Sequence, residues 1–84
     1  MTKRTVTIEL ASGLEARPIA MLVQKASQYS SSVYIEVGAK KINAKSIMGM
    51  MSLSVVSGDE VVVVTEGKDE EAAANDIEAY LHKQ

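Results

Sequence analysis

The sequence contains no cysteine and only one histidine and one proline. The absence of cysteine excludes disulfide bridges, thiolate zinc sites and thiol nucleophiles. No segment approaches the roughly 20 consecutive apolar residues of a membrane-spanning helix, and the first residues lack the apolar core of a signal peptide. We therefore expect a cytoplasmic protein. The single histidine, His82, lies near the end of a predicted helix, where we expect it to be solvated and not catalytic.

Neither positive nor negative charge is in large excess, because the formal net charge is −2. Basic residues are adjacent only in the pairs Lys3-Arg4 and Lys40-Lys41, which disfavours nucleic acid as a direct ligand. A chain of 84 residues is long enough for one domain with a thin core, but not for two domains or a deep cleft. No His/Asp/Glu cluster has metal-ligand spacing. We therefore expect a non-enzymatic protein without a metal or cofactor.

Four segments have the composition of strands. Thr5–Leu10 and Val33–Val37 alternate polar and apolar residues. Lys40–Asn43 follows closely enough to form a hairpin, with a tight turn that needs a positive φ at Gly38. Glu60–Thr65 contains four consecutive valines, which suit a strand at the centre of a sheet.

Three segments have the pattern of helices. Apolar residues at helical spacing predict a helix that starts at Ala16 and ends within Ser30–Ser32. Ile47–Leu53 is predicted as a short helix, and Asp69 as the N-cap of a third helix that Lys83 closes. The resulting order β-α-β-β-α-β-α predicts an α+β fold. We expect an open-faced β-sandwich with a four-stranded antiparallel sheet and three helices on one face.

The first candidate site is the segment Ser12–Pro18, which enters the first helix. A helix N-terminus offers unpaired N–H groups and a partial positive charge to an anion. Arg17 adds a planar set of donors that suits a phosphate or a carboxylate. The simpler interpretation is a capped helix with a solvated pair between Arg17 and Glu15, which would contribute almost nothing to stability.

The second candidate site is Asn43–Gly49, in which Ser46 occupies the expected N-cap of the short helix. A structural cap is one interpretation, and its loss would cost roughly 0.5–2 kcal/mol. The other is phosphorylation, because a phosphate adds about −1.5 to −2 charges that the helix dipole and the exposed N–H groups stabilise. The local pattern leaves both interpretations open.

The short helix also carries more apolar side chains than two turns can bury. The simpler interpretation places Met50 and Leu53 in the core and treats the remaining side chains as incidental. The functional interpretation makes Ile47, Met48 and Met51 an adaptable apolar surface for a protein partner.

These two segments together resemble the HPr family, the histidine-containing phosphocarriers of the bacterial sugar phosphotransferase system. Gly13–Pro18 resembles the family's phosphorylation loop. Lys45–Gly49, followed by Met51–Leu53, resembles its regulatory serine segment. The resemblance covers essentially the whole chain and implies a single HPr-like domain over residues 1–84.

One residue departs from the family pattern. Glu15 stands where a phosphocarrier has the histidine that carries the phosphoryl group, and a carboxylate repels incoming phosphate unless it is neutralised. We therefore do not expect phosphate carriage. Two alternatives remain: a phosphocarrier component that forms an acyl phosphate on Glu15, and a permanent negative charge that imitates a phosphorylated histidine.

The resemblance extends to histidine-lacking members of the family that act in carbon catabolite repression in bacilli. It implies that HPr kinase/phosphorylase phosphorylates Ser46 and that the product is a corepressor of catabolite control protein A, a LacI-type repressor. The partner-binding residues that it implies are Glu15, Arg17, Ala20, Ile47, Met48 and Met51. A homodimer formed by exchange of the first strand is a further structural possibility.

Overall fold

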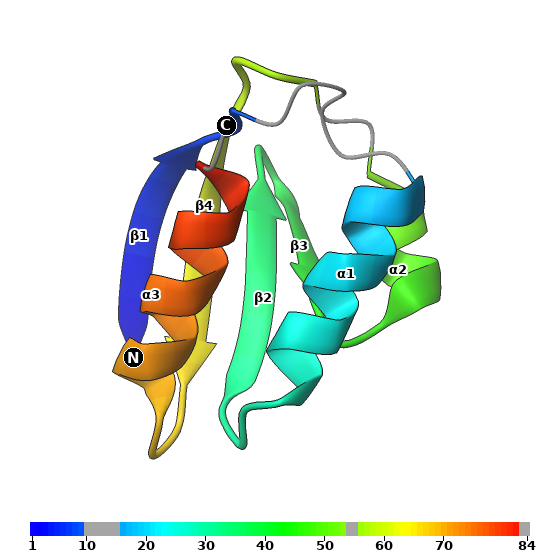
Figure 1. The fold of residues 1–84 in the computed structure, drawn as a ribbon. Helices are drawn as coiled ribbons and strands as arrows, with labels where there is room; N and C mark the ends of the chain where they lie inside the picture. The colour runs from blue at the N-terminus through cyan, green and yellow to red at the C-terminus, as the bar shows by residue number, and fades with distance from the viewer. Residues whose placement is uncertain (10–15, 54–55, 83–84) are drawn as a thin grey trace.

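The computed structural model describes residues 1–9, 16–53 and 56–82. It contains a four-stranded sheet and three helices (Figure 1). In chain order the elements are β1 (Thr2–Thr7), α1 (Ala16–Ser27), β2 (Ser32–Val37), β3 (Lys40–Asn43), α2 (Ile47–Met51), β4 (Glu60–Glu66) and α3 (Glu70–Leu81). The predicted fold class and element order are confirmed.

The sheet is antiparallel throughout, with the strand order β1-β4-β2-β3. β4 therefore lies between two partners, and Val61, Val63 and Val64 are buried there. The prediction of a central valine-rich strand is confirmed. The predicted hairpin is also present, and its turn holds Gly38 at a φ of 60°, which a residue with a Cβ adopts at a cost.

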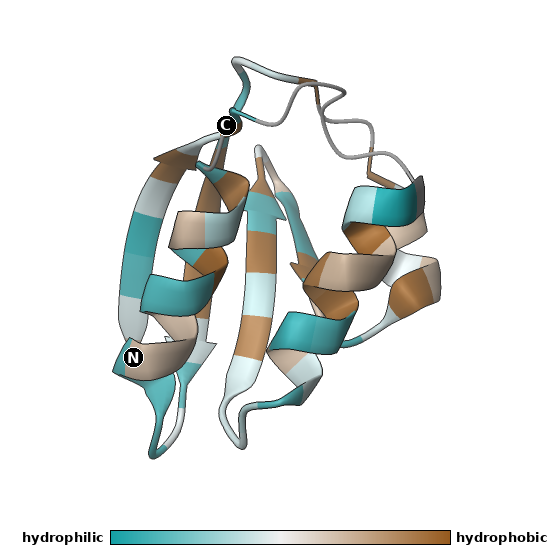
Figure 2. Cartoon of the chain, in the orientation of Figure 1, coloured by the Kyte–Doolittle hydropathy of each residue, from teal (hydrophilic) through white to brown (hydrophobic). Residues whose placement is uncertain are grey.

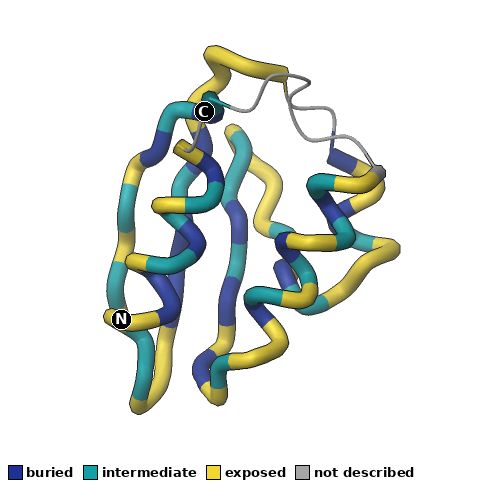
Figure 3. The backbone as a smooth tube through the Cα atoms, in the orientation of Figure 1, coloured by how far each residue is buried: buried dark blue, intermediate teal, exposed yellow. Residues whose placement is uncertain are grey.

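The three helices cover one face of the sheet, and the core fills the space between these two layers (Figures 1 and 3). Apolar and more polar residues alternate along β2 in the colouring of Figure 2, as a strand with one covered face requires. The largest buried apolar side chains of this core include Ile8, Leu22, Ile35, Met50, Ile77 and Leu81.

The first strand begins and ends earlier than predicted. β1 covers Thr2–Thr7, whereas the alternation predicted Thr5–Leu10. Its ladder with β4 starts with Thr2 opposite Thr65, so the pairing partner determines the bounds of this strand. Leu10 lies outside the described residues.

The first helix is shorter than predicted. α1 ends at Ser27, before the predicted end within Ser30–Ser32. The N–H groups of Ser30 and Ser31 donate to the Asp69 carboxylate at 3.0 and 2.9 Å. A contact that is distant in sequence therefore replaces the next turn of the helix.

The second helix also ends early, at Met51 and not at Leu53. The amides of Ser52 and Leu53 donate to Gly49 O and Met50 O, each at 3.1 Å. These i→i−3 bonds tighten the chain into a final turn and stop the α-helical pattern.

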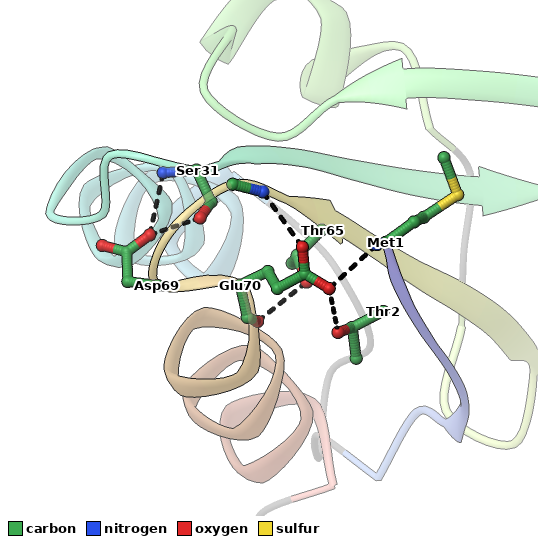
Figure 4. A network of polar contacts seen from close by, with 7 residues as sticks. Met1, Thr2, Ser31, Thr65, Asp69 and Glu70 are labelled. Atoms are coloured by element: carbon green, nitrogen blue, oxygen red, sulfur yellow. Dashed lines mark hydrogen bonds and ion pairs between the residues drawn. The ribbon is translucent and has the colours of Figure 1, made fainter.

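Asp69 is the N-cap residue of α3, as predicted, but its side chain does not cap the helix. Its carboxylate accepts hydrogen bonds from Ser31 N and the Ser31 hydroxyl (Figure 4). It also accepts from Ser30 N, and it makes no side-chain cap bond to α3. These bonds, the Ser31 hydroxyl first, hold the pKa of Asp69 below its ordinary value. Asp69 thus joins the start of α3 to the connection between α1 and β2. Lys83, the predicted closing residue of α3, lies outside the described residues.

A second polar network joins β1 to α3. The Glu70 carboxylate accepts from the Thr2 hydroxyl at 2.6 Å and from Gly67 N at 3.1 Å, and it lies 3.0 Å from the Met1 ammonium (Figure 4). These contacts, the Thr2 hydrogen bond first, lower the pKa of Glu70 to about 2. Farther along, Arg4 Nη1 donates to Asn75 Oδ1 and Glu78 Oε1.

Candidate functional site

The candidate site is built on the turn between β3 and α2. Ala44 is buried, and its N–H donates to Val33 O at 2.8 Å. The Asn43 side chain accepts from Lys45 N at 2.8 Å, and its carbonyl accepts from Ser46 N at 3.0 Å. Asx-type bonds of this kind hold a turn in one conformation. The backbone therefore presents Ser46 at a defined position.

Ser46 is the N-cap of α2, as predicted. Its backbone is extended, and its hydroxyl oxygen accepts from Gly49 N at 3.2 Å. The carbonyl of Ser46 accepts the first intrahelical bond, from Met50 N at 2.9 Å. A Cβ on Gly49 would lie 3.3 Å from the Ser46 hydroxyl oxygen, so a glycine leaves room for the cap. The Ser46 side chain is exposed, so a modifying enzyme can reach the hydroxyl.

The apolar side chains of the α2 segment fall into a buried group and an exposed group. Met50 and Leu53 are buried, with exposed fractions of 0% and 7%. Ile47, Met48 and Met51 are exposed by 49%, 83% and 53%. We call these last three residues the methionine patch. An exposed, flexible apolar patch of this kind is a surface on which a protein partner can dock.

The helix α1 packs against α2 and carries exposed residues of its own. Arg17 is exposed and Ala20 is partly exposed. Met21 is exposed by 48% and is absent from the residues predicted from sequence. The sequence does carry a signal for the exposure of Met21, because this residue lies off the stripe of apolar residues that α1 buries. Glu15 lies outside the described residues, as does most of the first candidate segment, so its pairing with Arg17 is not described.

Sequence reasoning also missed a contact of Lys45, the residue before the capping serine. Lys45 Nζ donates to Tyr29 O at 2.7 Å, just beyond the end of α1. The pattern of local residues carries no signal for this bond, because the two residues belong to separate elements. It ties the start of α2 to the end of α1.

The remaining candidate chemistry lies elsewhere in the fold. His82 is exposed, and its Nδ1 lies 3.0 Å from Glu9 Oε2. A shallow cavity of about 400 Å³ beside the end of α2 is lined by Val37, Ala39, Lys40, Ser52 and Leu53. No group of three metal-ligating side chains occurs within the described residues. Within the same residues, no helix has the length and apolar character to cross a membrane.

The open-faced sandwich, with an exposed serine that caps a short helix, is the arrangement that the resemblance to the HPr family implied. Comparison with known sequences supports this resemblance directly. The family profile PTS-HPr, described as "PTS HPr component phosphorylation site", matches residues 2–83. The chain belongs to the HPr family.

Two relatives are named "HPr-like protein Crh". The chain is 44% identical over 84 residues to Crh of Halalkalibacterium halodurans, covering 100% of both chains. It is also 44% identical over 84 residues to Crh of Bacillus subtilis, covering 100% of this chain and 99% of the relative. The inferred resemblance to the HPr family is confirmed, and it includes a full-length similarity to Crh.

Solved structures agree with the fold. The phosphocarrier protein HPr of Bacillus anthracis superposes with a TM-score of 0.92 and 41% identity, covering 95% of each chain. The crystal structure of B. subtilis Crh gives a TM-score of 0.79 and 44% identity, covering 99% of this chain and 95% of that chain. That Crh structure is described as an intertwined dimer with an unexpected swapping domain.

Proposed function

We propose that this protein is a regulatory phosphoprotein of carbon catabolite repression. HPr kinase/phosphorylase phosphorylates Ser46, and the product acts in the cytoplasm as a corepressor of catabolite control protein A. The protein performs no catalysis itself. Its phosphorylated cap and the methionine patch bind the LacI-type repressor together, with Glu15, Arg17 and Ala20 contributing from the α1 side.

The observation that supports this proposal most strongly is the setting of Ser46. Its hydroxyl is exposed, lies at the N-cap of α2 and is followed at once by the exposed side chains of Ile47 and Met48. A phosphate there gains favourable interactions with the helix N–H groups. The docking surface is already apolar before modification, so the phosphate adds charge specificity to an existing contact area.

The first experiment is intact-mass measurement after incubation with HPr kinase/phosphorylase and ATP. We expect one phosphate on the native chain and none on Ser46→Ala. Ser52→Ala is the matched control, because Ser52 is also exposed in this segment and its hydroxyl donates to Gly49 O at 2.6 Å. A Ser46→Ala protein that is phosphorylated to the native level would refute the assignment.

The second experiment measures the affinity of catabolite control protein A for both forms. We expect the phosphorylated form to bind more tightly, and Met48→Ala to weaken its binding by about fivefold or more, as for a contributing interface side chain. Met48 is 83% exposed, so its truncation leaves the fold intact. Equal repressor affinity of the two native forms would remove the switch.

The alternative function is a phosphocarrier component of the sugar phosphotransferase system. The similarity to the B. anthracis phosphocarrier supports it, whereas Glu15 in place of a histidine argues against it. A carrier would form a hydroxylamine-labile acyl phosphate with phosphoenolpyruvate and the general phosphotransferase enzyme. The absence of such an adduct would dispose of this alternative.

We also propose that the chain can form a homodimer by exchanging β1. The description of B. subtilis Crh as a swapped dimer supports this. β1 is an edge strand that pairs with β4 alone, so its departure leaves the other strand pairs of the sheet intact. Sedimentation at several protein concentrations should reveal the dimer, and a monomer at every concentration would contradict it.

A further inference from the structure

Lys45 makes a contact that local sequence does not explain. Its Nζ donates to Tyr29 O at 2.7 Å, and Tyr29 follows the end of α1 at Ser27. Carbonyl groups at a helix C-terminus lack intrahelical partners and carry partial negative charge, so an ammonium is favoured there. A hydrogen bond with a charged donor is also stronger than a neutral one.

The acceptor end of this bond is itself held in place. Tyr29 N donates to Ala26 O at 3.2 Å, which continues the end of α1. The Tyr29 hydroxyl donates to Asp76 Oδ2 at 2.8 Å, which connects the residue to α3. Lys45 therefore links the cap of α2 to Tyr29, a residue that hydrogen bonds to α1 and α3 hold in place.

This link joins the two parts of the candidate site. Ser46 and the methionine patch belong to α2, a helix of only five residues. Arg17, Ala20 and Met21 belong to α1, which the β2–β3 hairpin separates from α2 in the chain. Buried Met50 packs α2 onto the core, and the Lys45 bond fixes the turn that precedes the helix.

We propose that Lys45 is a positioning residue for Ser46. Its ammonium, bonded to Tyr29 O, fixes the cap of α2 relative to α1. A protein that contacts both helices, such as the kinase that modifies Ser46, then meets one arrangement of the two surfaces. This inference rests on the proposed phosphorylation of Ser46 and extends it to a residue that regulates how the serine is presented.

The test compares Lys45→Met, which keeps the apolar stem but removes the donor, with Lys45→Arg, which keeps a charged donor. Lys41→Met is the matched control for loss of a surface charge. Lys41 Nζ lies 4.6 Å from the ring centroid of Tyr34, on the strand pair β2–β3. Lys41 is exposed and precedes the core-facing Ile42, so it lies on the sheet face away from the helices.

The first readout is the initial rate of phosphorylation by HPr kinase/phosphorylase over a range of substrate concentrations. A substrate that spends less time in the competent arrangement has a weakened apparent affinity. We expect Lys45→Met to raise KM by about threefold to tenfold, with kcat changed by less than about twofold. Lys45→Arg should recover the native KM within about twofold, and Lys41→Met should leave KM unchanged.

The second readout needs no kinase. Hydrogen exchange of the Gly49 and Met50 amides, which donate to Ser46 Oγ and Ser46 O, reports whether the cap is held in the free protein. Lys45→Met should accelerate this exchange by about threefold to tenfold, and Lys41→Met should not. The native chain and all three variants are compared at a temperature at which circular dichroism shows each to be folded.

The outcomes separate the two proposals. A raised KM with unchanged amide exchange would overturn the positioning role, because Lys45 would then contact the kinase directly. An unchanged KM and unchanged exchange would overturn it as well. If the native chain were not phosphorylated on Ser46, the proposed function would fail, while the exchange measurement would still support or refute the link between Lys45 and the cap.

Discussion

The edge strand β1 offers the sharpest test of how this fold is held together. Arg4 Nη1 donates to Asn75 Oδ1 at 2.9 Å and to Glu78 Oε1 at 2.8 Å, so a single guanidinium joins β1 to two positions on α3. We predict that Arg4→Met destabilises the protein. Methionine keeps an unbranched apolar stem on the core side of the strand but removes both bonds.

The expected magnitude follows from the exposure of the pair. The side chains of Arg4 and Glu78 are 33% and 39% exposed, so solvent screens their attraction and the ion pair contributes less than about 1 kcal/mol. The hydrogen bond to Asn75 adds about 0.5–1.5 kcal/mol. We expect a total loss of about 1 kcal/mol, which lowers Tm by about 4–8 °C in a domain of this size.

Lys3→Met is the matched control for this prediction. Lys3 is the neighbouring residue on β1, is exposed and points to the opposite face of the sheet, away from α3. Its replacement should change stability by less than about 0.5 kcal/mol. Thermal unfolding followed by circular dichroism measures both variants. An unchanged Tm for Arg4→Met, or an equal loss for Lys3→Met, would show that the contacts to α3 contribute nothing to holding β1.

Three further predictions concern single positions. Gly67→Ala should lower Tm much more than Gly38→Ala, because a Cβ on Gly67 would lie 2.7 Å from a backbone atom, whereas at Gly38 it meets nothing within 4 Å; equal Tm values would contradict this. Met50→Ala should cost about 2–5 kcal/mol in denaturant unfolding because Met50 is fully buried, while Met48→Ala should cost less than about 0.5 kcal/mol. Glu70→Gln should be less stable than the native chain near pH 6. The pKa of Glu70 falls from 4.5 to about 2 on folding. The stability that the Glu70 carboxylate contributes is therefore fully present above the unfolded pKa and is lost as the pH falls toward 2. The difference in Tm should therefore shrink in acid, and a difference independent of pH would refute this account.

Periodicity allowed most of the elements and part of the site to be predicted. The alternation around Val33–Val37 and the helical spacing after Ala16 are short-range patterns, and the structure contains both elements. The sequence predicts Ser46 as a cap because a serine before an apolar helical segment satisfies a free N–H group of the first turn. The exposed methionines followed from volume, since a two-turn helix has too little buried surface for all of them.

The errors arose where a distant residue competed for a local group. Asp69 occupies the predicted N-cap position of α3, but its carboxylate binds the amides of Ser30 and Ser31 across the fold and not the first turn of the helix. The same contacts ended α1 early. Likewise, the bounds of β1 depend on β4, whose residues follow much later in the chain. Local patterns contain no record of these pairings.

The amino-acid sequence alone determined the order of the elements, the absence of thiol chemistry and the serine that caps the short helix, because each depends on residue types and their spacing. Only the tertiary structure decided that Lys45 reaches Tyr29 and that α1, which carries the exposed Met21, packs against α2. Those features depend on which surfaces meet when helices and sheet pack. That choice follows from the burial of the whole core and not from any single segment.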